Sequence, residues 1–169
     1  MATVRQLLLP EEAQFLAANF PQYVKNNGTN FPVSGLAYDG GSTNEEAFWK
    51  FVASAYGSGN LTFTLFWYAD TASSGNVQWG VRISAITANT DSQDIETDAL
   101  ATATETQDSH LGTTGQRLHS LDVTVSNLDS LADGDYVTVG IYRDASDTTN
   151  DTMTGDAILV AALLSYSDT

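Results

Sequence analysis

The 169-residue sequence contains no cysteine and has few positive charges. The lack of cysteine excludes disulfides, thiolate metal sites and cysteine nucleophiles. Six Lys and Arg residues stand against 21 Asp and Glu residues, which gives a formal net charge of −15. A nucleic-acid-binding protein needs cations to neutralise phosphates, and an anionic membrane surface repels so acidic a chain. We therefore expect neither nucleic acid nor membrane as a partner.

Long apolar runs are also missing. No segment approaches the roughly 18 apolar residues of a membrane-spanning helix, and the residues after Met1 lack the basic segment and apolar core of a secretory signal. The hydrophobic share of 42%, with 10% aromatic residues, is too high for a disordered chain. The composition predicts a folded protein that is poor in reactive side chains.

From Phe31 onward the sequence has the alternation typical of β-strands. The clearest example is 61–68, where every second residue is a large apolar one. Segment 156–166 is apolar on both faces, which favours a central strand over a helix because turn residues flank it. The expected strands are 32–38, 46–54, 60–69, 76–87, 97–106, 116–125, 135–143 and 156–166. They predict an all-β fold, a two-sheet jelly-roll-like sandwich of about eight antiparallel strands, over residues 31–169.

Residues 1–30 have a different pattern and are expected to form an N-terminal arm. Three consecutive leucines precede Pro10, which can begin a short helix or turn that ends near Pro21. The leucines do not alternate with polar residues, so either the chain's own domain or a neighbouring one must cover them. We expect an intersubunit contact, because an arm before the first strand usually lacks a fixed partner within its domain. Its candidate interface residues are Arg5, Leu7, Leu8, Leu9, Phe15 and Leu16.

Groups that can perform chemistry are few. The sequence has two histidines, His110 and His119, and no nucleophile motif such as Gly-x-Ser-x-Gly accompanies them. Alternation places His119 opposite Leu118. We expect structural roles for both histidines and no catalytic function.

Two acid-rich segments are candidate calcium sites, because calcium takes about six to eight oxygen ligands. One contains Asp91, Asp94, Glu96 and Asp98, and the other contains Asp144, Asp147, Asp151 and Asp156. Neither has the spacing of an EF-hand loop, so acids that form turns and keep the chain soluble are the favoured interpretation. We expect no cofactor, with calcium as the alternative.

Aromatic residues can fill a β-core or form a sugar-binding face, on which flat rings stack against pyranose rings. Alternation places Trp49 and Phe51 opposite Phe48, and Trp67 opposite its two neighbours. Because aromatic side chains dominate β-cores, we expect one or two of these rings at most to remain for a surface role. The residues concerned are Phe48, Trp49, Phe51, Phe66, Trp67, Tyr68 and Trp79.

The order of turns and strand starts resembles that of the jelly-roll structural proteins of tailed bacteriophages, which include capsid cement or decoration proteins. The segments that carry the resemblance are GNVQWGV at 75–81, GDYVTV at 134–139, IYRDASD at 141–147 and GDAILV at 155–160. The resemblance covers about residues 45–166. It is a pattern of strands and turns rather than a catalytic motif.

This resemblance implies a non-enzymatic virion protein, made in the host cytoplasm, that binds the head surface and stabilises the assembled shell. It implies a homotrimer whose partners are the major capsid protein and neighbouring copies of itself. The alternative is a carbohydrate-binding β-sandwich, in a phage tail or fibre protein or in an accessory binding module. An exposed aromatic platform favours the alternative, and an apolar arm detached from its own domain favours cementing.

Overall fold

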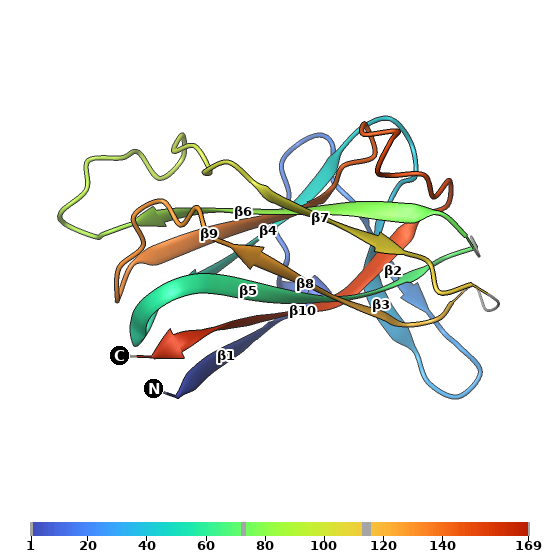
Figure 1. The fold of residues 1–169 in the computed structure, drawn as a ribbon, viewed down its shortest axis with the longest axis horizontal. Helices are drawn as coiled ribbons and strands as arrows, with labels where there is room; N and C mark the ends of the chain where they lie inside the picture. Colours follow the sequence, from blue (N-terminus) through green and yellow to red (C-terminus); the bar gives the residue numbers. More distant parts are fainter. Residues whose placement is uncertain (1, 72–73, 113–115, 169) are drawn as a thin grey trace.

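The computed structural model describes residues 2–71, 74–112 and 116–168, and within these ranges the regular secondary structure is almost entirely β-strand (Figure 1). One 3-10 turn, η1 (Pro10–Glu12), is present beside ten strands. The strands are β1 (Thr3–Leu8), β2 (Gln22–Asn26), β3 (Val33–Tyr38), β4 (Glu45–Val52), β5 (Tyr56–Ala69), β6 (Asn76–Ile86), β7 (Thr104–Ser109), β8 (His119–Val125), β9 (Tyr136–Arg143) and β10 (Ala157–Asp168). The predicted all-β class is confirmed.

Two antiparallel sheets pack face to face as a sandwich (Figure 1). The six-stranded sheet has the order β2-β3-β10-β5-β8, with β1 also paired to β10, and the four-stranded sheet has the order β4-β9-β6-β7. Along β10, Ala157–Leu159 pair with β3, whereas 162–167 pair with β1. The predicted central position of the 156–166 strand is confirmed, because β10 also pairs with β5.

The core between the sheets holds the large aromatic residues. Trp49, Trp67 and Trp79 are each at most 2% exposed, and the edge of the Tyr38 ring meets the Trp79 ring at 5.1 Å between centroids. Phe48 points to the opposite side of β4 from Trp49, as the alternation predicts. The expectation that aromatic residues mainly fill the core is confirmed.

The structure does not separate residues 1–30 from the rest of the chain. β1 pairs with β10 from Thr3↔Ser167 to Leu8↔Ala162, so the two ends of the chain lie side by side (Figure 1). Leu8 is 1% exposed and belongs to the core, whereas Leu7 is 50% exposed. The reason is that β3 leaves most of one edge of β10 unpaired, and the N-terminal segment occupies that edge as a strand.

Two local predictions need correction. Of the short helix or turn expected to begin at Pro10, only the single turn η1 forms, because Gln14 makes a backbone bridge with Phe48 of β4. The strand expected at 97–106 begins at Thr104, because the segment before it forms a loop whose Ala101 N–H donates to the carbonyl of Ile83 at 2.7 Å. In the part of the chain that the structure describes, no helix has the length and apolar character needed to cross a membrane.

Candidate functional site

The outer face of the four-stranded sheet is the floor of a groove. Strand alternation turns the large apolar side chains of β4, β9 and β6 inward and leaves a row of mainly polar side chains and two glycines outside. Its central members are Glu46, Phe48 and Lys50 of β4, Thr138, Gly140 and Tyr142 of β9, Gly80, Arg82 and Ser84 of β6, and Glu105 of β7.

Loop segments on two sides form the walls. Residues 14–19 are held against the edge of β4, where Gln14 and Phe48 exchange two backbone hydrogen bonds of 2.8 and 2.9 Å and the Glu46 N–H donates to the carbonyl of Asn19 at 3.0 Å. The opposite wall, residues 95–101, is tied to β6, where the hydroxyl of Ser84 donates to Asp98 at 2.6 Å. Both walls are therefore fixed to the floor by hydrogen bonds.

Two hollows follow one another along β9 within this groove. The first has a volume of about 370 Å³ and lies over Phe48, Ser84 and Thr138. The second has a volume of about 390 Å³ and lies over Arg82 and Tyr142. Leu16 lines both hollows, and we call the two hollows together the groove.

The ring of Tyr142 lies across Gly80 on the groove floor. A Cβ added at Gly80 would lie 2.2 Å from Cζ of that ring, so only glycine leaves room for it. The Tyr142 hydroxyl donates to Oε1 of Glu105 at 2.6 Å. Burial raises the pKa of Tyr142 well above its usual value, and the hydrogen bond to Glu105 and the charges of Glu105 and Asp144 add to this effect, which keeps the hydroxyl protonated.

An ion pair crosses the floor beside this ring. Arg82 of β6 binds Glu46 of β4 through two hydrogen bonds, Nε to Oε1 at 2.7 Å and a terminal nitrogen to Oε2 at 2.5 Å. The pair passes over Gly140, where a Cβ would lie 2.2 Å from Oε1 of Glu46. The guanidinium also lies 5.7 Å from the centroid of the Tyr142 ring. The floor thus brings an aromatic ring, a guanidinium and two carboxylates together.

Asp144 lines the second hollow. Burial favours a higher pKa for this carboxyl, but hydrogen bonds from Ser146, from Asn44 and from the backbone outweigh it, so its pKa is lowered. Asp144 therefore carries a negative charge at neutral pH.

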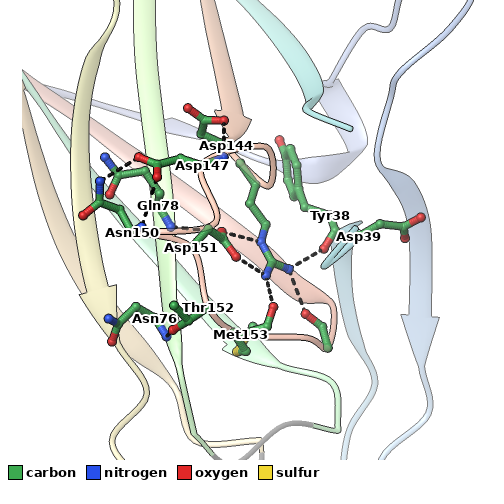
Figure 2. Close-up of polar contacts among 12 residues, drawn as sticks. Tyr38, Asp39, Asn76, Gln78, Asp144, Asp147, Asn150, Asp151, Thr152 and Met153 are labelled. Atoms are coloured by element: carbon green, nitrogen blue, oxygen red, sulfur yellow. Dashed lines mark hydrogen bonds and ion pairs between the residues drawn. The ribbon is translucent and has the colours of Figure 1, made fainter. Parts of the chain in front are cut away.

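A buried ion pair fixes the loop that contains Asp144. The guanidinium of Arg143 is 0% exposed and binds both carboxylate oxygens of Asp151, at 2.8 and 2.7 Å. Its remaining N–H groups donate to the backbone carbonyls of Tyr38, Gly155 and Met153. Figure 2 shows Tyr38, Asp151 and Met153 around the guanidinium. This arrangement satisfies the buried charge and ties the loop to β3 and β9.

The acid-rich segments use their carboxylates to form turns. Asp147 accepts hydrogen bonds from the backbone of Thr149 and Asn150, and Asp94 accepts one from the backbone of Glu96. Among the described residues, no group of three or more His, Cys, Asp or Glu side chains is arranged to hold a metal ion. The structure thus offers no support for calcium, and the expectation of no cofactor stays a prediction.

The histidines lie at the seam between β7 and β8. His119 is 2% exposed, stacks on Trp67 at 4.2 Å between centroids, and has Nδ1 3.4 Å from Oδ2 of Asp108. Its ring lies 5.2 Å from that of His110. Leu118 is 58% exposed, so the alternation predicted for this segment is confirmed. The absence of catalysis stays a prediction.

The predicted interface residues are divided between two places. Arg5 and Leu7 are exposed on β1 and Leu9 follows them, whereas Leu8 is in the core. Phe15 and Leu16 line the first hollow instead. Their role in a contact between subunits stays a prediction.

Of the floor residues, sequence reasoning singled out only Phe48, as one of the aromatic candidates for a surface role. The available signal was the pair of glycines inside strands, Gly80 and Gly140, since a glycine within a strand often marks a close approach by another group. That signal indicates the place but does not identify the side chain that approaches.

No protein-family model matches the chain, and no curated protein matches it. Among solved structures, a family 28 carbohydrate-binding module specific for non-crystalline cellulose matches with a TM-score of 0.50 and 6% identity, over 91% of this chain and 85% of that one. A family 11 carbohydrate-binding module from Clostridium thermocellum, in complex with a β-1,3-1,4-mixed-linked tetrasaccharide, has a TM-score of 0.47 and 7% identity over 96% of this chain and 87% of that one. The enzymatically active domain of tailspike protein 4 of bacteriophage CBA120 has a TM-score of 0.42 and 9% identity over 94% of this chain but 19% of that one. The first of these likenesses shows a shared jelly-roll-like sandwich fold.

Proposed function

We propose that the protein is a carbohydrate-binding β-sandwich module and that a glycan chain binds in the groove on the four-stranded sheet. The fold shared with a carbohydrate-binding module supports this proposal. It favours the binding module over a capsid cement protein, because the solved structure that shares this fold is a carbohydrate-binding module.

The arrangement of Tyr142 and Arg82 on the groove floor carries the proposal. A sugar ring presents flat C–H faces and a rim of hydroxyl groups, so it matches a floor of planar groups whose edges donate and accept hydrogen bonds. Glu46 and Glu105 provide acceptors beside these groups, and Asn19 and Asn44 add amides at the edge of the second hollow. A concave site with a few convergent polar groups is typical of ligand binding.

Capsid binding remains a second candidate because of the N-terminal segment. Leu7 is 50% exposed, Leu16 is 65% exposed, and scattered apolar side chains of this size are common at protein interfaces.

Affinity electrophoresis and titration calorimetry with soluble neutral polysaccharides test the binding module: mixed-linked β-glucan, a soluble cellulose derivative and xylan. We expect at least one to bind, and Tyr142→Ala to abolish that binding. Tyr23→Ala is the matched control, because Tyr23 is 48% exposed on β2 of the other sheet. Urea unfolding verifies that both variants fold. The proposal fails if no glycan binds, or if folded Tyr142→Ala binds as the unmodified protein does.

A further inference from the structure

We propose that the groove selects uncharged glycans and rejects glycans that bear carboxylates, with Glu105 and Asp144 as the residues that set this selectivity. The inference rests on the proposed function and adds the class of ligand to it.

The charged side chains that line the groove are mainly acidic. Five carboxylates face two cations, and the full set is Glu46, Glu96, Asp98, Glu105 and Asp144 against Lys50 and Arg82. Both cations already have partners within the protein, because Arg82 binds Glu46 and Lys50 donates to the side chain of Gln14. A carboxylate on a ligand would therefore have to displace an existing contact to gain a cation.

The excess of negative over positive charge is greatest in the second hollow. Arg82 compensates the charge of Glu46, which leaves the charges of Glu105 and Asp144 uncompensated by the other residues that line this hollow. Glu105 accepts a hydrogen bond from the Tyr142 hydroxyl at 2.6 Å, and Asp144 lines the same hollow. A sugar that packs against this floor brings its substituents within a few ångströms of two negative charges.

Local charges rather than the net charge of −15 set this selectivity. Salt screens exposed charges over about 8–10 Å, so acids on the far sheet act weakly on a ligand in the groove. Groups about 4–6 Å away in a site partly shielded from water act strongly. A hydroxyl on the ligand is not repelled, and the carboxylates can accept its hydrogen bonds.

A matched pair of ligands tests this inference: an oligosaccharide of mixed-linked β-glucan, and the same oligosaccharide with one hydroxymethyl group oxidised to a carboxylate. For the unmodified protein at low salt, we expect the affinity for the neutral ligand to exceed that for the oxidised ligand by a ratio of about ten or more. In Glu105→Gln/Asp144→Asn, we expect this ratio of the two affinities to fall to about threefold or less. The ratio compares two ligands on the same protein, so it reports the selectivity even where the substitutions also change the affinity for the neutral ligand.

The control is Glu12→Gln/Asp122→Asn, which makes the same change in net charge at two exposed acids outside the groove, one in η1 and one on β8. This control variant should leave the ratio of the two affinities unchanged. Equal binding of the two ligands to the unmodified protein would overturn the proposed selectivity but not the proposed function. The same holds if the control variant lowers the ratio of the two affinities as much as the groove variant does. If the neutral oligosaccharide does not bind at all, the proposed function fails, and the inference fails with it.

Discussion

The ring of Tyr142 occupies the space above Gly80 that any other residue would fill with its own side chain, since a Cβ there would lie 2.2 Å from Cζ of the ring. The side chain of Tyr142 extends from β9 over Gly80 of β6 to Glu105 of β7. A glycine inside a strand costs backbone entropy and offers no side chain to pack. Here the aromatic ring supplies that packing from the neighbouring strand.

Replacing Gly80 with alanine should therefore damage the groove more than the fold. The new methyl group would push the Tyr142 ring off the floor, so we expect glycan affinity to fall about tenfold or more while the free energy of unfolding drops by about 1–3 kcal/mol. Calorimetry with mixed-linked β-glucan and urea unfolding measure the two effects. Gly41→Ala is the control, because no atom lies within 4 Å of a Cβ built there. Unchanged affinity in folded Gly80→Ala would contradict the assignment of Tyr142 to the site.

The fold could largely be predicted from the sequence, because most of its strands bury one face. The alternation in 61–68 and in 137–141 placed strands correctly, since the same side chains that alternate are the ones that enter the core. β1 and β2 were not predicted. Their exposed residues alternate weakly, and the partner that makes β1 a strand is β10, more than 150 residues later in the chain.

The groove was harder to predict than the fold. Its floor comes from four strands whose order in the sheet is not their order in the chain, so Glu46, Arg82 and Glu105 meet only through the topology. The hydrophobic pattern identifies which residues point outward but not which outward residues are neighbours across strands. Its wall at 95–101 was expected to contribute to a strand, which would have removed the hollow altogether.

The ion pair of Arg143 and Asp151 should be a main support of the loop beside the groove. Asp151→Asn leaves a guanidinium that is 0% exposed without its counter-charge, so we expect a loss of about 3–5 kcal/mol in the free energy of unfolding. Chemical denaturation measures it. Arg82→Met is the comparison, because the Arg82 side chain is 38% exposed and its pair with Glu46 should contribute about 1 kcal/mol or less. A cost below about 1 kcal/mol for Asp151→Asn would show that the pair does not hold the loop.

Stability should decrease on mild acidification because of His119. Burial beside Trp67 lowers the pKa of this imidazole below its usual 6.5, and His110 and Arg117 act in the same direction, while Asp108 opposes them. The unfolded chain therefore takes up the proton at a higher pH than the folded chain does. It follows that the His119 contribution to stability is present above about pH 6.5 and is lost as the pH falls from there towards the lower pKa of the folded state.

Urea midpoints measured from about pH 7.5 down to 5 test this pH dependence. His119→Phe keeps a ring against Trp67 but cannot titrate, so its midpoint should change less over the same range. Parallel curves for the two proteins would mean that other groups cause the loss of stability. The comparison uses the change of the urea midpoint with pH rather than the absolute stability, because the substitution also removes the contact with Asp108.

Substitutions in the leucine run at 7–9 can test a structural role of the N-terminal segment separately from a role in assembly. Leu8 is 1% exposed in the core, so Leu8→Ala should cost about 2–5 kcal/mol. Leu7 and Leu9 are 50% and 36% exposed, so replacing both with serine should change the stability of an isolated chain by no more than about 0.5–1 kcal/mol. If these two side chains form a contact between subunits, Leu7→Ser/Leu9→Ser should lower the oligomer mass measured by light scattering, or weaken binding to emptied phage heads, while urea unfolding shows an intact fold. A variant that keeps both its mass and its particle binding would show that the exposed leucines are not an interface, and that β1 serves only to complete the six-stranded sheet.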